Sequence, residues 1–316
     1  MKKVFLSMFV AMMATVAIQA QQIAVVSGST TSTYKTLAEA ITKAPEGSVI
    51  YLPGGGFPLS DDVKITKKLT IIGIGYNAKS DNADGRTLIE GNLFFNAGSD
   101  DSAVMGCYIN GNVYIGDGED KPEVDNILIK FCNLNSVQVQ NSSCLGTVVN
   151  QNLIRDTSNF NYAGGKVTNN ILHSLYKLKN VDILYNIVTY YYWYGYNFRD
   201  CDDCTILNNV ILAWSGHNGS NCQISGNLLN GNWGEYNTNI GVDWNDVFEN
   251  NAGVNPVSNY HFKEAYQQYE GKCGIYGGTG FSDGQLPPVP YISYKSVPTE
   301  TDASGNLHVN ITVNAK

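Results

Sequence analysis

A six-residue motif recurs seven times in the middle of this 316-residue chain, and it constrains the fold more than any other feature of the sequence. Each copy has an apolar residue, two variable residues, an Asn or Cys, and a pair whose second member is apolar. The copies occupy residues 104–109, 129–134, 149–154, 167–172, 183–188, 206–211 and 224–229. Because the motif is constant while the intervals between copies vary, the pattern indicates a solenoid whose coils each pack on their neighbours.

Each copy predicts a short strand, a bend and a second strand, because its apolar residues are β-branched or Leu at nearly alternating positions. Stacking the coils in register places equivalent residues about 4.8 Å apart. Buried amides at the bend then satisfy one another, and Cys extends the column as a small apolar residue. The residues at the fourth position are Cys107, Cys132, Asn152, Asn170, Asn186, Asn209 and Asn227.

This column resembles the asparagine ladder of the right-handed parallel β-helix in the pectate-lyase-like superfamily, and the resemblance covers residues 36–234. It implies an all-β solenoid. It does not imply an activity, because that superfamily contains lyases, glycoside hydrolases, epimerases and structural proteins. Residues 244–248 and 274–278 are similar to the closing portion of exported β-helix proteins common in Bacteroidetes.

The two ends of the chain differ from the repeats. Residues 1–20 have two Lys, an apolar run and a Gln-Ala pair, which predict a secretory signal peptide and hence a protein in the periplasm, on the cell surface or outside the cell. Residues 21–48 should form an N-terminal cap containing a short amphipathic helix that begins after Thr36. We expect residues 49–284 to form the β-helix and its closing segment.

Residues 285–316 should form an extended C-terminal β appendage. Apolar and polar residues alternate from Leu307 to Val313, as in a half-buried strand. Its partner is either the segment 291–296, which would make a hairpin, or the open edge of the solenoid.

Composition argues against several classes of partner. The formal net charge is −8 and the chain has three Arg, so we expect no nucleic-acid partner. No segment after the signal peptide is apolar over the length of a membrane span, so we expect no transmembrane segment. We also expect a monomer. The seven Cys are interpreted as small core residues more than as disulfide partners.

An aromatic flank is the main candidate for substrate binding. Variable connectors could bring tryptophans of successive coils onto one face, where flat rings suit the apolar faces of sugars. The alternatives are that the C-terminal segment covers these rings or that they pack in the core. The residues assigned to the flank, with two neighbouring cations, are Tyr191, Trp193, Trp214, Trp233, Lys177 and Arg199.

A charged group is the candidate for catalysis. Arg155 and His173 lie three residues beyond the ladder position in successive coils, and Asp156 adjoins Arg155. A guanidinium, a carboxylate and an imidazole together could neutralise a uronate and abstract its α proton, as in a polysaccharide lyase. The alternative is a solvated salt-bridge cluster at a turn.

We expect no cofactor and no metal site. Calcium is the alternative, because residues 81–85 and 116–120 form oxygen-rich loops. Basic groups are scarce on the coils, so binding of a polysaccharide or cell-surface glycan is placed before lyase activity, and whether the chain is an enzyme stays open. An adhesin of surface assemblies would share the features of the glycan binder.

Overall fold

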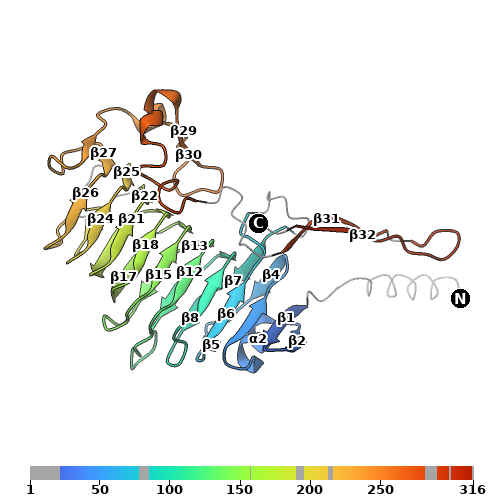
Figure 1. Cartoon of the computed structure of the whole chain (residues 1–316). Helices are drawn as coiled ribbons and strands as arrows, with labels where there is room; N and C mark the ends of the chain where they lie inside the picture. The colour runs from blue at the N-terminus through green and yellow to red at the C-terminus, as the bar shows by residue number, and fades with distance from the viewer. Residues whose placement is uncertain are drawn as a thin grey trace, which may run out of the picture.

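The computed structural model describes residues 22–77, 85–156, 158–189, 196–212, 216–281, 290–298 and 300–314. These residues form a parallel β-solenoid whose coils stack along one axis (Figure 1). Each coil crosses three sheets, named A, B and C here in the order in which the chain meets them. The predicted all-β solenoid is therefore confirmed, together with a helical cap and a C-terminal β appendage.

Sheet A contains the first strand of each motif. Inward-facing residues such as Ile129, Val149 and Val167 pair in register on neighbouring strands and are fully buried. Among the described residues it has eleven strands, which in spatial order are β2 (Thr30–Tyr34), β1 (Ile23–Ser27), β3 (Ser48–Tyr51), β6 (Leu69–Ile72), β9 (Ala103–Met105), β12 (Leu128–Lys130), β15 (Val148–Asn150), β18 (Lys166–Thr168), β21 (Asp182–Leu184), β24 (Thr205–Leu207) and β26 (Gln223–Ser225).

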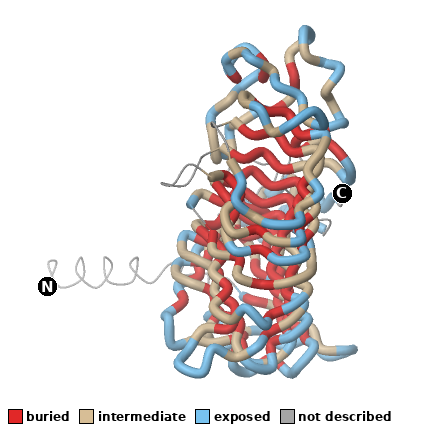
Figure 2. The backbone as a smooth tube through the Cα atoms, turned by 90° about the vertical axis from the view of Figure 1, so that its left-hand side faces the viewer, coloured by how far each residue is buried: buried red, intermediate tan, exposed pale blue. Residues whose placement is uncertain are grey.

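Sheet B contains the second strand of each motif. Its inward residues, such as Leu134 and Ile154, complete the buried interior that runs along the solenoid (Figure 2). Counting described residues, its ten strands in spatial order are β28 (Thr238–Asn239), β27 (Leu228–Leu229), β25 (Val210–Ile211), β22 (Ile187–Val188), β19 (Ile171–Leu172), β16 (Leu153–Ile154), β13 (Asn133–Leu134), β10 (Tyr108–Ile109), β7 (Thr87–Glu90) and β4 (Gly55–Pro58).

Sheet C returns the chain from sheet B to sheet A. Val113 and Ile115 of one strand pair with Val137 and Val139 of the next, and all four side chains face the core. In the described part of the chain its seven strands, in spatial order, are β23 (Phe198–Arg199), β20 (Leu175–Lys179), β17 (Ser158–Ala163), β14 (Val137–Val139), β11 (Val113–Ile115), β8 (Leu93–Phe95) and β5 (Lys64–Ile65).

The bend between sheets A and B has the same backbone form in successive coils. The residue before each ladder position is left-handed, with φ of 54° at Phe131, 56° at Gln151 and 56° at Asn169. A single left-handed residue turns the chain sharply and directs the following side chain into the core. The ladder residues are consequently buried at the corner of the solenoid.

The asparagine ladder is a continuous chain of hydrogen bonds. The Asn186 amide nitrogen donates to Asn209 Oδ1 at 2.9 Å and to the Val167 carbonyl at 2.8 Å. Its Oδ1 accepts from the backbone and side-chain nitrogens of Asn170, both at 3.0 Å. The same pattern begins at Asn152 and extends past Asn227 to Asn237, which the motif did not include. Each buried amide is thereby satisfied.

The N-terminal cap closes one end of the solenoid. Helix α2 (Leu37–Lys43) begins after Thr36, whose Oγ1 accepts from the Glu39 backbone nitrogen at 3.2 Å, as predicted. Leu37, Ala40 and Ile41 are buried beneath it. Strands β1 and β2 pair antiparallel and extend sheet A past its first parallel strand, so the cap pairs a strand edge that would otherwise be open.

The segment after the last coil folds back over sheet B, and we name residues 243–281 the cover. Its elements are α3 (Trp244–Val247), β29 (Phe248–Asn250), β30 (Asn259–Phe262) and the 3₁₀ helix η1 (Glu264–Tyr269). Trp244, Phe248 and Ile275 share one buried cluster with outward residues of sheet B. The outward residues that it covers are Leu153, Ile171, Ile187, Val210 and Leu228.

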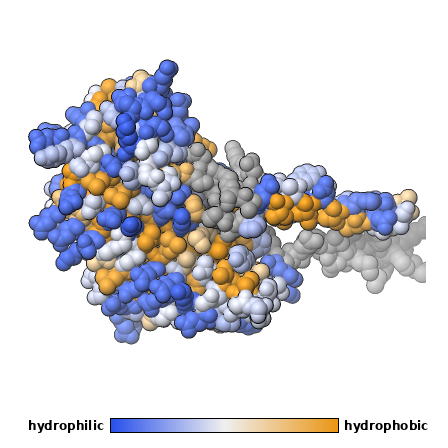
Figure 3. All heavy atoms as spheres, in the orientation of Figure 1, coloured by the Kyte–Doolittle hydropathy of each residue, from blue (hydrophilic) through white to orange (hydrophobic). Residues whose placement is uncertain are grey.

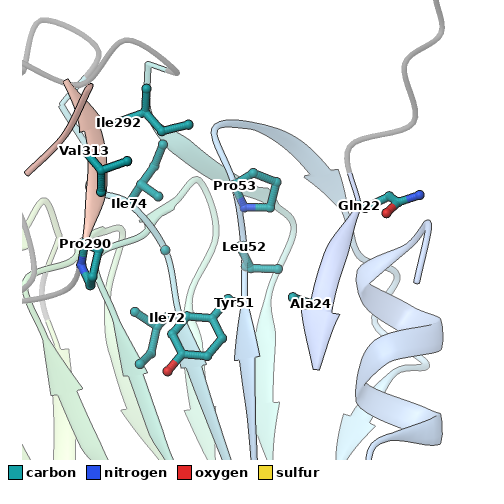
Figure 4. Close-up of a pocket in the computed structure, with 11 residues that line it drawn as sticks. Gln22, Ala24, Tyr51, Leu52, Pro53, Ile72, Ile74, Pro290, Ile292 and Val313 are labelled. Atoms are coloured by element: carbon teal, nitrogen blue, oxygen red, sulfur yellow. The ribbon is translucent and has the colours of Figure 1, made fainter. Parts of the chain in front are cut away.

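The C-terminal appendage is a hairpin of β31 (Tyr291–Ser296) and β32 (Asn310–Asn314), named the arm here. Of the two predicted partners for the last strand, segment 291–296 is confirmed. The arm extends away from the solenoid and exposes an apolar strip (Figures 1 and 3). At its base, Ile292 and Val313 lie beside Ile74 and, together with Ile72, line a hollow of about 270 Å³ (Figure 4).

Candidate functional site on the outer face of sheet C

A column of polar and aromatic side chains runs along the outer face of sheet C. Register pairing joins its members strand by strand, and we name them the outer column. It spans about 29 Å, because neighbouring strands lie about 4.8 Å apart. The members, in order along the solenoid, are Lys64, Phe94, Tyr114, Gln138, Asn159, Tyr176 and Arg199.

The aromatic rings of the outer column pack against their own neighbours. Phe94 and Tyr114 are stacked with ring centroids 4.9 Å apart and planes 8° apart, and Lys64 Nζ lies 3.2 Å from the Phe94 centroid. The Tyr176 ring lies under the Arg199 guanidinium at 4.7 Å and near Lys177 Nζ at 5.1 Å. These contacts occupy ring faces, so a ligand would meet the column through ring edges, hydroxyls, amides and cations.

A β-bulge interrupts the column between β17 and β20. Asn159 pairs with Tyr176 and Tyr162 pairs with Leu178, so two residues on β17 stand opposite the single residue Lys177. Lys177 is left-handed with φ of 58°. Bulges redirect side chains and are over-represented beside binding sites. Here the bulge places Asn161 and Lys177 on the outer face together.

A polar hollow of about 250 Å³ lies over this bulge. Two cations and two carboxylates line it, so it offers hydrogen-bond donors and acceptors of both signs within one small volume. Its side chains come from sheet C and from the turn that follows it. Its polar lining residues are Ser142, Asn161, Lys177, Lys179, Asp200 and Asp202.

The carboxylates of the hollow are held in place by the next coil. Asp202 accepts from the Ser220 backbone nitrogen at 2.8 Å and from its hydroxyl at 2.7 Å, and these bonds lower the pKa of Asp202. Asp200 accepts from the Asn218 amide at 3.0 Å and contacts Arg199 Nε at 3.5 Å. Such supporting contacts fix the orientation of the carboxylates before any ligand arrives.

Two of the predicted substrate-binding residues therefore come together, since Lys177 and Arg199 both contact Tyr176 beside the hollow. Trp233 lies elsewhere, half-buried at the end of the core, with its ring edge-on to Phe198 and to His217 at 5.5 Å each. Its contact with a glycan stays a prediction. Tyr191, Trp193 and Trp214 lie outside the described residues.

Arg155, predicted to be catalytic, is held by the solenoid itself. Its guanidinium donates to the Tyr108 hydroxyl at 2.8 Å and to the carbonyls of Ile109 at 2.9 Å and Leu134 at 3.3 Å. It also lies over the Tyr108 ring, 4.8 Å from the centroid. These bonds tie three coils together, which gives the guanidinium a structural role.

The other two residues of that group are close to each other. Burial lowers the pKa of the His173 imidazole, while the nearby Asp156 carboxylate acts in the opposite direction. Asp156 is exposed and His173 is half-buried. The two side chains therefore interact electrostatically, whereas the predicted neighbourhood of Arg155 and His173 and the lyase activity assigned to the group stay predictions.

Two features of the structure were not predicted from the sequence. The first is the bulge, for which the motif carried no signal because it lies in a connector. The second is the apolar outer face of sheet B. Its signal was present: the fifth motif position is Leu, Ile or Val from the third copy onward, and strands buried on both faces read as continuous apolar runs.

Within the described residues, no group of three or more His, Cys, Asp or Glu side chains is arranged to hold a metal ion. Nor does that part of the chain contain a helix that is long and apolar enough to cross a membrane. Of the two loops considered for calcium, residues 81–84 lie outside the description.

Comparison of the chain with models of protein families, with curated proteins and with solved structures gives no match in any of the three. The assignment of a parallel β-solenoid therefore rests on the strand order and pairing of the stacked sheets.

Proposed function

We propose that the protein is an exported, non-catalytic glycan-binding β-helix that holds its ligand along the outer face of sheet C. The observation that carries the proposal is the polar hollow over the β17–β20 bulge, continuous with the outer column. The proposal includes export, which the signal-like residues 1–20 support. It also includes membership of the pectate-lyase-like superfamily, which the asparagine ladder supports.

The chemistry of the hollow suits a sugar. Hydroxyl groups both donate and accept, and Lys177 and Lys179 supply donors beside the acceptors of Asp200 and Asp202. The two signs balance, which favours a neutral glycan over a polyanion. Beyond the hollow, Asn159, Gln138 and the Tyr114 edge continue the polar surface along the axis, so a linear glycan can contact several coils.

The test starts with the full chain on a glycan array, followed by calorimetric titration of the best oligosaccharide. Lys177→Ala should raise Kd about tenfold or more, because a hydrogen bond to a charged group contributes roughly 1.5–3 kcal/mol. The matched control is Lys166→Ala, an exposed lysine on sheet A paired with Asp182 at 3.9 Å, which should leave Kd unchanged.

The proposal is wrong if the two variants bind alike, or if the array shows no glycan bound above background. Loss of binding in both variants would place the ligand on another face. Melting temperatures of the variants, compared with the parent chain, separate lost contacts from lost structure.

A further inference from the structure

Three thiols meet at the C-terminal end of the solenoid. Thr205 of β24 pairs with Gln223 of β26, and the Gln223 backbone nitrogen donates to the Cys204 carbonyl at 2.9 Å, so Cys204 and Cys222, which each stand one residue before their strand, are side by side. The Cys222 Sγ donates to the Cys201 carbonyl at 3.0 Å. Burial raises the pKa of Cys222, and hydrogen bonding to Cys204 acts in the opposite direction.

The spacing of this pair suits a covalent link. Neighbouring strands lie about 4.8 Å apart, within the range of about 4.4–6.8 Å that separates the Cα atoms of bridged cysteines. Cys204 is buried whereas Cys222 is partly exposed. A dissolved oxidant can therefore reach the Cys222 thiol first, and the buried Cys204 thiol can react with Cys222 afterwards.

We propose that Cys204 and Cys222 form a disulfide that ties the last strand of sheet A to its neighbour, with a glutathione-type disulfide as oxidant. The Cys222 thiolate attacks the oxidant, whose S–S bond breaks and releases one glutathione thiol. The Cys204 thiolate then attacks the Cys222 sulfur and releases the second. Two protons leave the protein, and two electrons reduce one glutathione disulfide to two thiols.

The chain contains its own matched control. Cys107 and Cys132 are also side by side, because Tyr108 pairs with Asn133, but neither is exposed. The strand geometry of the two pairs is the same, and access by the oxidant differs. Oxidation should therefore be confined to the pair at the end of the solenoid.

A bond at this position would stabilise the terminal strand of sheet A. Strand β26 is the last in the order of sheet A, and its residues are more exposed than those of inner strands. Terminal strands separate from a solenoid most readily, since they pack on one neighbour. A bond between β24 and β26 would oppose this fraying.

The experiment incubates the folded full chain with oxidised glutathione, alkylates remaining thiols after denaturation, and maps the peptides by mass spectrometry without reduction. We expect a Cys204–Cys222 peptide, with Cys107, Cys132 and Cys201 alkylated. Reductant should lower the melting temperature of the oxidised chain and leave that of Cys222→Ala unchanged. Cys201→Ala should still form the bond.

Two results would overturn the proposal. One is full alkylation of both Cys204 and Cys222 after oxidation, and the other is a bond from Cys222 to Cys201 in their place. If Cys222→Ala folds poorly, the peptide map of the parent chain and of Cys201→Ala decides alone.

Discussion

At the scale of single residues, the ladder amides are the most demanding positions in the molecule. Each interior Asn bonds to the coil before it and the coil after it, as Asn186 does with Asn170 and Asn209. Removing one side chain leaves backbone and amide groups of two neighbours buried without partners, and this costs more than the lost bonds themselves.

Asn186→Ala should therefore lower the free energy of unfolding by about 2–4 kcal/mol. Asn237 ends the ladder, is half-buried and serves one neighbour, so Asn237→Ala should cost about 1 kcal/mol or less. Urea denaturation followed by circular dichroism measures both. Equal losses would show that the interior of the ladder contributes no more than its end.

At the scale of elements, the cover is attached to the solenoid partly by hydrogen bonds from one buried side chain, Asn169. Asn169 Nδ2 donates to the carbonyls of Ile275 at 2.8 Å and Gly277 at 2.7 Å. A side chain at Gly274 would crowd Ile187 and Val210, so the cover approaches sheet B closely at this point. The cover and the solenoid are thus joined by polar bonds at one edge and apolar packing across the face.

Asn169→Gly should loosen the cover without disturbing the coils, because glycine keeps the left-handed backbone while deleting the three side-chain hydrogen bonds to Ile275, Gly277 and Thr279. We expect faster hydrogen exchange across the cover and unchanged exchange in sheets A and C. Asn221→Gly, also left-handed and exposed, is the control and should alter neither. Faster exchange throughout the chain would mean that cover and coils unfold as one unit.

At the scale of the whole molecule, the cover and the arm differ in what they bury. The cover shields a continuous aliphatic face of sheet B. The arm is a two-stranded hairpin whose apolar side chains, Leu307, Val309, Ile311 and Val313 among them, stay about half-exposed. Its base meets the first coils around a hollow, so few of its contacts support the solenoid.

A chain ending at residue 281 should consequently melt within about 3 °C of the full chain. A chain ending at residue 242 should melt much lower and aggregate, because it exposes the outward Leu, Ile and Val of sheet B. Scanning calorimetry with light scattering tests the pair. A large loss in the longer fragment would show that the arm stabilises the coils.

The sequence by itself determined the solenoid, its ladder and the helix after Thr36, whereas for the partner of the last strand it left two possibilities open. These depend on spacing along the chain: a strand has a period of two, a helix cap is local, and a repeat stacks on itself. The motif located Cys107 to Asn227 in one column without any knowledge of the connectors. It also placed Arg155, Asp156 and His173 in neighbouring coils.

Only the tertiary structure decided which side chains share a surface. The bulge that brings Lys177 to Asn161, the return of the cover over Ile171, and the attachment of Arg155 to Tyr108 all depend on connectors whose lengths follow no period. Contacts between distant segments are set by packing and by the burial of polar groups, which no local pattern encodes. The motif therefore predicted the core, and the tertiary structure located the candidate site.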